Sequence, residues 1–510
     1  MGTHLEVERT FAPDVDTELP DMTGLPGVAG ISEPQTWHLE ATYFDTQGLA
    51  LTRAGISLRR RTGGEDEGWH LKVPAAVGRL EERLPLSRAR LAPPGELREL
   101  VLGRTRTAGL EPVANITTTR TVRRLLGVNG TVLAEIADDV VRAESPVADT
   151  APAQWREWEV ELVAGDLGLL EAAEELITSA GVPVSAVQSK IVRALAPRLE
   201  NTPTAERQPP SATGPARLLV LPWLQEQVEE LLRQDLVTRR GGASGVHQMR
   251  VAGRRLRAAL ATYRPLLDRE VTEPLRDELR WLIGALGGAR DAQVAHELLA
   301  ELVEREAQRT DVTALRRQLA AAHDSAEQEM TDHAAELLGS ERYLVLVENL
   351  VTLQDVPPWT EAAERAAHDV VLSRVVKDVE RLVRRHEEAD AWRAPGEEGA
   401  YDHATHEVRK AAKRLRYACE SVEAIWRKDA RRLRRRAKQV TELLGERNDT
   451  VLTRAELERL AAEATQAGES AFVHGRLHAQ EEQHADELTA AYLRHWPKVA
   501  RRLRAWPEPR

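Results

Sequence analysis

The stretch His247-Gln-Met-Arg-Val-Ala-Gly-Arg-Arg-Leu-Arg257 returns further along the chain as His406-Glu-Val-Arg-Lys-Ala-Ala-Lys-Arg-Leu-Arg416. A second pair of segments follows the same spacing, because Leu286-Gly-Gly-Ala-Arg-Asp291 is answered by Leu444-Gly-Glu-Arg-Asn-Asp449. The two offsets agree within one residue, since 406 minus 247 is 159 and 444 minus 286 is 158. This agreement indicates an internal duplication, and the spacing of the apolar residues predicts helices.

Each copy of the motif places its basic residues along one side of the predicted helix. They recur at i, i+3, i+7 and i+10, positions that share one face of an α-helix. The residues are His247, Arg250, Arg254 and Arg257 in the first copy, and His406, Arg409, Lys413 and Arg416 in the second. A single basic run is usually a solvated helix face, but its repetition in the same register favours a binding site for a long polyanion. Because nearby positive charge opposes a dication, we interpret both histidines as hydrogen-bond donors to phosphate instead of metal ligands.

The apolar residues of each copy lie one position before the basic ones. They are Val246, Met249, Gly253, Leu256 and Leu260 in the first copy, and Thr405, Val408, Ala412, Leu415 and Cys419 in the second. Since one position is about a quarter turn, the basic side chains are expected to border a helix contact.

The duplicated H-x-x-R-x-x-x-[RK]-R-L-R helices resemble the CHAD domain, an α-helical family with conserved histidines that binds inorganic polyphosphate. The resemblance covers residues 218 to 508 and implies that the two basic stripes contact polyphosphate. Arg255, Lys410 and Arg414, one step around the helix, are weaker candidates. The stretch from Lys428 to Lys438 carries seven cations against one acid. It either widens the basic surface or is an ordinary exposed helix face, and the pattern supports both equally.

Composition narrows the class of protein. A chain of 510 residues suits two or three domains. No apolar run approaches the roughly 20 residues that span a bilayer, and no secretory signal is visible, so we expect no membrane partner. The single cysteine, Cys419, excludes an internal disulfide and favours the cytoplasm. A net charge of −11 argues against nucleic acid as a partner. Of the 70 basic residues, 62 are arginine, which suits phosphate recognition, although a GC-rich genome produces the same bias.

The periodicity of the chain changes near residue 197. Residues 3–197 alternate with the period of strands, residues 198–217 are rich in proline, serine and threonine, and residues 218–508 follow helical periodicity. We therefore expect an α+β multidomain protein, in which an N-terminal antiparallel β-barrel tunnel is joined by a linker to an all-α domain. The duplication divides that all-α domain into two similar helical-bundle halves.

The predicted strands carry charges on one face. Glu6 and Glu8 alternate with Leu5 and Val7, and Glu157, Glu159 and Glu161 alternate with Trp158 and Val160. Arg59 alternates with Leu58, and Lys72 with Leu71, in the same way. One such strand is usually the wet face of a sheet, but several together predict a closed barrel with a charged interior. Carboxylates would hold a hard cation there, and arginine and lysine would hold a phosphate chain, a combination suited to metal-assisted phosphoryl chemistry.

These strands resemble the CYTH superfamily, the triphosphate tunnel metalloenzymes. Glu6-x-Glu8 matches the start of the E-x-E-x-K signature, Tyr43-Phe-Asp45-Thr the Y-x-D-T element, and Leu58-Arg59-x-Arg61 the L-R-x-R strand. The resemblance implies metal ligands at Glu6, Glu8, Glu81, Asp138, Glu159 and Glu161, with Mg²⁺ or Mn²⁺ as cofactor. It implies triphosphate ligands at Arg59, Arg61, Lys72, Arg120 and Lys190, and catalytic roles for Glu6, Glu8 and Lys72. Among Glu135, Asp138 and Asp139 the choice stays open, and Asp138 is the working assignment.

One position departs from the family pattern. Thr10 stands where the lysine of E-x-E-x-K is expected, and Arg9 cannot replace that lysine because adjacent strand residues face opposite ways. The resemblance implies hydrolysis of inorganic triphosphate, with polyphosphate bound by the helical domain, at a rate that Thr10 puts in question. The alternatives are a non-catalytic polyphosphate-binding protein and, ranked lower, a class IV adenylyl cyclase. The expected location is the cytoplasm, in association with polyphosphate granules.

Overall fold

The computed structural model describes residues 2–87, 92–145, 152–187, 189–200, 209–242, 244–393 and 398–504. For residues 288–295, 321–331, 398 and 504 the description extends to the backbone only. The chain forms two compact units, residues 1–207 and 208–510. No helix among these described segments is both long enough and apolar enough to span a membrane.

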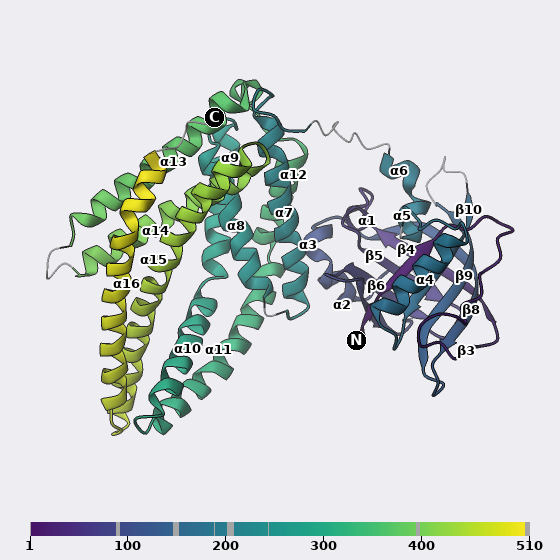
Figure 1. The fold of residues 1–510 in the computed structure, drawn as a ribbon, viewed down its shortest axis with the longest axis horizontal. Helices are drawn as coiled ribbons and strands as arrows, with labels where there is room; N and C mark the ends of the chain where they lie inside the picture. Colours follow the sequence, from purple (N-terminus) through teal and green to yellow (C-terminus); the bar gives the residue numbers. More distant parts are fainter. Residues whose placement is uncertain are drawn as a thin grey trace. The chain divides into compact units, whose positions relative to one another are not determined.

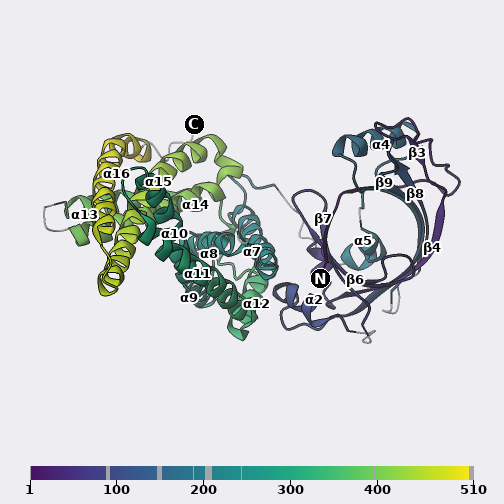
Figure 2. The same ribbon diagram turned by 90° about the horizontal axis from the view of Figure 1, so that it is seen from below.

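The first unit is built on one antiparallel sheet that curls into a nearly closed barrel, seen end-on as a ring of strands in Figure 2. Its strands are β1 (Gly2–Glu6), β2 (Glu8–Phe11), β3 (Gly30–Ile31), β4 (Gln35–Asp45), β5 (Ser57–Thr62), β6 (Gly68–Pro74), β7 (Arg79–Leu84), β8 (Glu111–Leu126), β9 (Val132–Glu144) and β10 (Ala153–Leu162). Their order is β1-β7-β6-β5-β4-β8-β9-β10-β2, and β3 pairs with β8. Because only Val7 separates β1 from β2, the chain itself joins the two edges of the sheet. The barrel expected from the sequence is confirmed.

The register of the strands places the predicted charged residues on the inner face. Cross-strand partners share a face, so the pairs Glu161↔Glu8, Lys72↔Glu81 and Arg59↔Tyr43 extend one inward set around the barrel. Arg120 belongs to the same face, because it pairs with Asp139, which pairs in turn with Glu157. The alternation in the sequence therefore becomes a charged lumen.

The outer face of the barrel is apolar where a helix covers it. Trp158 and Val160 of β10 are fully buried against Leu170 and Ile177 of α4 (Leu167–Ser179). At the inner face, α5 (Lys190–Ala194) packs Ile191 against residues such as Tyr43 and Val141, and in Figure 2 it lies inside the ring. The remaining helices of this unit are α1 (Ala50–Arg53), α2 (Gly95–Leu100), α3 (Leu102–Thr105) and α6 (Ala196–Glu200). Apolar residues thus hold the barrel from outside and from one end of its interior.

The second unit is helical, and its long antiparallel helices are seen in Figure 1. They are α7 (Arg217–Arg239), α8 (Gly245–Thr262), α9 (Arg269–Ala285), α10 (Gly288–Glu306), α11 (Thr313–Gly339), α12 (Glu341–Asp355), the 3₁₀ helix η1 (Glu361–Glu364), α13 (Ala367–Asp390), α14 (Glu398–Ser421), α15 (Glu423–Gln466) and α16 (Phe472–Arg504). The duplication is visible in this order, because α8 corresponds to α14 and α11 to α16. In the first copy α9 ends and α10 begins at Leu286-Gly287, whereas in the second copy α15 continues as one helix through Leu444-Gly445.

The apolar faces predicted for the motif helices are in the core. Met249, Leu256 and Leu260 of α8 are fully buried, as are Leu415 and Cys419 of α14. Both helices belong to one large hydrophobic cluster that runs through the two halves. This burial explains why the basic residues, one position further on, border the helix contacts.

The expected linker, residues 198–217, overlaps described structure at both ends. Its start lies in α6, which ends at Glu200, and its end packs on the helical unit. There the backbone N–H of His368 donates to the carbonyl of Ala212 at 2.8 Å, and that of Ala216 donates to the carbonyl of Arg365 at 2.9 Å. Residues 201–208 lie outside the described segments.

Candidate functional site

The lumen of the barrel is lined almost entirely by ionisable side chains. Seven are cationic and five are carboxylates, so the lining carries an excess of positive charge suited to a polyanion. The lining residues are Glu6, Glu8, Tyr43, Ser57, Arg59, Arg61, Asp66, Lys72, Arg79, Arg83, Arg120, Glu159, Glu161, Ser189 and Lys190. Every predicted triphosphate ligand is in this set, together with four of the six predicted metal ligands.

Three carboxylates at the junction of β1, β2 and β10 are poorly compensated. Burial, together with the neighbouring Glu6 and Glu8, raises the pKa of Glu161 to about 7. Burial also raises the pKa of Glu6, although Lys72 opposes this with its Nζ 2.6 Å from the Glu6 carboxylate. Crowded carboxylates in a buried site are the environment in which a divalent cation relieves repulsion. Glu6, Glu8 and Glu161 are therefore fitted to hold one.

A second acidic group lies deeper and is already compensated. Carboxylate oxygens of Asp139, Glu157 and Glu159 lie within 4.8 Å of one another, the only such trio among the described residues. The Nζ of Lys190 lies 2.9, 2.6 and 2.5 Å from these three carboxylates. Arg120 donates to Asp139 through Nε at 2.8 Å and also bonds Glu159. Although burial alone would raise the pKa of Glu159, Lys190 and Arg120 hold it well below its usual value.

The geometry of both groups suits a hard cation, because every donor is a carboxylate oxygen. The two groups differ in their charge balance. A cation at the second group would have to displace Lys190, which contacts all three carboxylates. At the first group Lys72 and Arg83 reach only Glu6, and no described lysine or arginine lies within ion-pair distance of Glu8 or Glu161. We therefore regard Glu6, Glu8 and Glu161 as the first cation position and Asp139, Glu157 and Glu159 as the second.

Glu81 is fully buried and joins several basic groups. Its carboxylate bonds Nδ1 of His70 at 2.8 Å and Nε of Arg83, and it lies 3.8 Å from both Lys72 and Arg59. Burial would raise the pKa of Glu81, but His70, Lys72 and Arg59 together lower it. The structure thus places Glu81 as an anchor for the cations of the wall.

The Tyr43-Phe-Asp45-Thr segment has a mainly structural role. Asp45 is 1% exposed and accepts hydrogen bonds from the backbone N–H groups of Thr46, Leu51 and Thr52 at 2.7, 2.9 and 2.8 Å. It thereby holds the turn into α1. Tyr43 faces the lumen, where its hydroxyl accepts a hydrogen bond from Arg59 at 3.3 Å.

One working assignment needs correction. Asp138 faces outward, where Arg156 grips it through two bonds of 2.9 and 2.7 Å, while Asp139 faces inward. Register explains the difference, since Asp138 pairs with Trp158 on the outer face. Glu135 also has inward parity but bonds Arg124 at 2.8 Å instead of lining the lumen. Asp139 is the carboxylate of this strand that the structure brings to the site.

Other lumen residues were not assigned from the sequence. Arg79 and Arg83 share the parity of Glu81 in β7, and Glu157 shares that of Glu159, so the same alternation could have found them. Thr10 pairs with Glu159 on the inner face and is 1% exposed, with no hydrogen-bond partner for its hydroxyl among the described groups. Arg9 faces outward and bonds Glu174 of α4 at 2.9 Å.

In the helical unit, α8 and α14 bring their basic stripes together. Burial, together with Arg409, Arg254 and Arg416, lowers the pKa of Lys413 to about 7. Because Arg254 belongs to α8 and the others to α14, the two copies of the motif contribute to one positive electrostatic field. No described carboxylate lies within ion-pair distance of Lys413. Arg257 extends the field towards α9, since its pKa is lowered by burial and by Arg280 and Arg276.

The duplicated Leu-Gly element supports an arginine of each stripe. A Cβ added to Gly287 would lie 3.4 Å from the guanidinium of Arg250, and one added to Gly445 would lie 3.5 Å from Arg409. His406 is placed by the same segment, because its Nδ1 lies 2.9 Å from Oδ1 of Asn448. The side chains of Arg290 and Asp291 lie outside the described part. The element therefore provides a flat surface on which the motif arginine rests.

The weaker candidates are engaged in ion pairs. Arg414 lies 2.7 Å from buried Asp378, Arg255 lies 3.2 Å from Glu420, and Lys410 lies 2.7 Å from Glu407. The first of these joins α13 to α14 within the core, so we assign Arg414 to stability.

The fold and site define a charged-lumen barrel joined to a duplicated helical domain with paired basic helices. The CYTH domain model matches residues 4–194, and the CHAD domain model matches residues 223–458. The uncharacterized protein MT2285 of Mycobacterium tuberculosis is 35% identical over 537 residues, which cover 98% of each chain. The chain belongs to this family of proteins, in which a CYTH domain, metal-dependent in its family, precedes a CHAD domain.

Two solved structures are similar to part of the chain. The CHAD domain of the plant Ricinus communis is 26% identical, with 60% of this chain and 97% of that chain covered and a TM-score of 0.45. PptA from Streptomyces chartreusis is 24% identical, with 56% of this chain and 99% of that chain covered and a TM-score of 0.44.

Proposed function

We propose that the barrel hydrolyses inorganic triphosphate with Mg²⁺ or Mn²⁺, and that the helical domain binds inorganic polyphosphate. The observation that carries the first part is the lumen, in which seven cations face two groups of carboxylates. Cations alone would bind a triphosphate without activating water, and carboxylates alone would repel it.

Each side of the lumen has a separate task in this proposal. Arg59, Arg61, Arg120 and Lys72 hold the phosphate oxygens and offset the charge that develops on the transferred phosphoryl group. Burial and the neighbouring Arg59 and Arg120 lower the pKa of Arg61, so a bound oxyanion would stabilise its charged form. Glu6, Glu8 and Glu161 would hold the divalent ion, which supplies Lewis-acid activation of phosphate and water. Water attacks a terminal phosphorus, the bridging P–O bond breaks, and orthophosphate and diphosphate leave.

The inorganic chain is favoured over a nucleotide by the chemistry of the lining. Tyr43 is its one aromatic residue, and its hydroxyl is committed to Arg59. A nucleobase is usually held in a largely apolar or aromatic slot, whereas this lining is charged almost throughout. The paired stripes of α8 and α14 support the second part of the proposal. A cytoplasmic location, in association with polyphosphate granules, belongs to the same proposal.

Phosphate release tests the activity. Triphosphate, ATP and long-chain polyphosphate are each incubated with Mg²⁺, Mn²⁺ or a chelator. We expect release from triphosphate that requires the metal and exceeds release from ATP. Formation of cyclic AMP from ATP would instead identify an adenylyl cyclase, and tight binding without turnover would identify a non-catalytic binding protein.

A further inference from the structure

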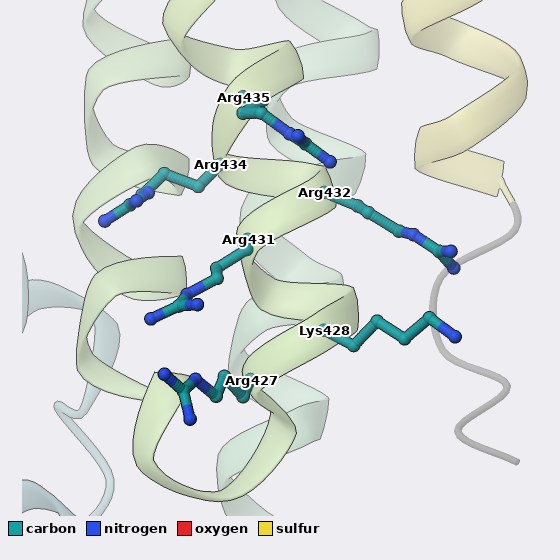
Figure 3. Close-up of a pocket in the computed structure, with 6 residues that line it drawn as sticks. All are labelled: Arg427, Lys428, Arg431, Arg432, Arg434 and Arg435. Carbon is teal, nitrogen blue, oxygen red and sulfur yellow. The ribbon is translucent and has the colours of Figure 1, made fainter.

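A second basic surface lies on α15, directly after a kink in that helix. Trp426 has non-helical angles, φ −105° and ψ 46°, and the next residues form a hollow of about 620 Å³. Six side chains line it, and all are basic: Arg427, Lys428, Arg431, Arg432, Arg434 and Arg435. We call these six residues the α15 patch. Figure 3 shows them in two rows, with Arg427, Arg431 and Arg434 directed to one side and Lys428, Arg432 and Arg435 to the other.

The α15 patch keeps most of its charge. Glu423 compensates Arg431 at 3.0 Å and Arg434 at 2.8 Å, and Asp429 lies 3.6 Å from Arg432. Within the described residues, no carboxylate pairs with Arg427, Lys428 or Arg435. These three side chains are exposed, and about half of the Arg432 side chain is exposed as well. The cations are therefore accessible to a large ligand.

The α15 patch is separate from the paired stripes and is only partly duplicated. Subtracting the repeat offset of 159 places Arg269 and Arg276 opposite Lys428 and Arg435, but the other four patch positions fall on residues without positive charge, namely Asp268, Thr272, Glu273 and Leu275. Between stripe and patch lie Glu420, which pairs with Arg255 and Arg416, and Glu423. An acidic boundary thus divides two cationic surfaces of one domain.

The chemistry of the α15 patch favours a phosphate chain over nucleic acid. Single-stranded nucleic acid is usually held by cations together with exposed aromatic side chains on which bases stack. The α15 patch has no aromatic member, and the adjacent Trp426 is only 9% exposed. The α15 patch supplies arginine guanidinium groups, which bind phosphate oxygens, and no aromatic side chain for stacking on a base.

We propose that the α15 patch is a second polyphosphate contact, which makes binding depend on chain length. This inference rests on the proposed binding of polyphosphate by the α8 and α14 stripes. A chain long enough to reach both surfaces gains the second contact at a high effective concentration, whereas a short chain occupies one surface at a time. The domain thereby discriminates long polyphosphate from its short breakdown products.

The test compares two charge-matched variants of the full chain. The patch variant carries Arg427→Gln, Lys428→Gln and Arg435→Gln. The control carries Arg316→Gln, Arg342→Gln and Arg459→Gln, at positions where about half of each side chain is exposed elsewhere on the domain. Affinity is measured at one salt concentration for polyphosphate chains of graded length and for a single-stranded RNA. We expect the patch variant to lose roughly tenfold or more for long chains and little for short ones, while the control stays near wild type.

Several results would overturn the inference. An equal loss for short and long chains would place the patch within one common site. A loss of RNA binding with polyphosphate binding unchanged would identify the α15 patch as a nucleic-acid surface. An equal loss of polyphosphate affinity in the control variant would show that the effect depends only on net charge. If the wild-type chain and the Lys413→Gln variant both fail to bind any polyphosphate, the proposed function of the domain fails, and the patch inference fails with it.

Discussion

Glu8 and Thr10 stand two residues apart on the inner face of β2, opposite Glu161 and Glu159. Glu8 lies beside Glu6 and Glu161, the two carboxylates with raised pKa values, while Thr10 adjoins the group that Lys190 and Arg120 already compensate. Single residues at these two positions therefore probe different halves of the proposed chemistry.

Replacing Glu8 by glutamine should remove most metal-dependent hydrolysis. The change keeps the shape but removes a charged oxygen ligand, and we expect a loss of roughly 100-fold or more in turnover, as for other electrostatic contacts at a reacting group. Phosphate release and thermal unfolding are measured together. Glu40→Gln, on the outer face of β4, is the control. Unchanged turnover in Glu8→Gln would exclude Glu8 as a ligand.

Replacing Thr10 by lysine should raise turnover more than affinity. The new ammonium group would enter the lumen beside Glu159, where it could contact a phosphate oxygen or the attacking water. A rise of several-fold in kcat with little change in KM is the expected signature of an interaction gained in the transition state. Thr36→Lys, outside the barrel, should leave both constants unchanged. A fall in kcat, or tighter binding alone, would show that the mechanism expected from the family does not operate here.

Lys413 should make polyphosphate binding depend on pH. Its pKa is lowered to about 7 by burial and by Arg409, Arg254 and Arg416, with Asp449 as the opposing charge. A bound polyanion favours the ammonium form, so binding takes up a proton above pH 7. Affinity should therefore fall as pH rises from 7 to 9, by up to about tenfold per unit. Lys413→Arg, which stays charged throughout, should flatten the profile. An equally steep profile in that variant would assign the dependence to another group.

At the scale of elements, the strands and the Leu-Gly segments decide where charges point. Glu82 lies on the same face of its strand as Leu80 and Leu84, so alternation favours Glu81 as the inward carboxylate, and the pairing of Glu81 with Lys72 confirms that it faces inward. Alternation did not separate Asp138 from Asp139, because carboxylates occupy both faces of the strand there. Ile136 lies on the same face as Asp138, but its apolar side chain marks the outer face only once α4 is known to cover that face. Arg79 and Arg83 had inward parity as well, but a charge at the end of a strand does not by itself reveal whether it reaches the lumen.

The helical motif was easier to predict than the geometry of its partners. A period of 3.6 residues places apolar and basic positions on fixed faces, so the buried set around Met249 and Leu415 followed directly. Other contacts bring together residues of separate helices. Arg414 pairs with Asp378, and Arg409 lies against Gly445. Such contacts depend on packing that no local pattern contains.

Polyphosphate binding should tolerate a methyl group at position 445 but not a large side chain. A Cβ at this position would lie at ordinary contact distance, 3.5 Å, from Arg409, so Gly445→Ala should bind polyphosphate normally. Gly445→Leu must push the guanidinium away, and we expect a loss of roughly threefold to tenfold in affinity, the cost of one charge-assisted contact. Gly475→Leu is the matched control, because nothing lies within 4 Å of a Cβ added there. Equal affinity in all three variants would remove the proposed support of Arg409.

At the scale of the whole molecule, two units with separate cores carry two separate charge patterns. Their independence predicts that residues 209–510 alone bind long-chain polyphosphate without metal and as tightly as the full chain does. The fragment starts before Ala212 because residues 212–216 bond the start of α13. Binding is measured in the presence of a chelator, and circular dichroism reports folding. A folded fragment that fails to bind would remove the polyphosphate assignment.

The closure of the barrel at Val7 also sets an order of assembly. Glu8 pairs with Glu161, so β2 finds its partner only after roughly 150 intervening residues have left the ribosome, an interval of about 8 to 30 s at ordinary translation rates. Until then β2 and its Glu8 are unpaired, although Glu6 of β1 can already pair with Arg79 of β7. Pairing over so long a sequence separation also makes closure slow relative to local contacts such as the α14–α15 hairpin. The charged lumen is therefore completed late in the synthesis of its unit, and a nascent chain cannot acquire the proposed chemistry before β10 is made.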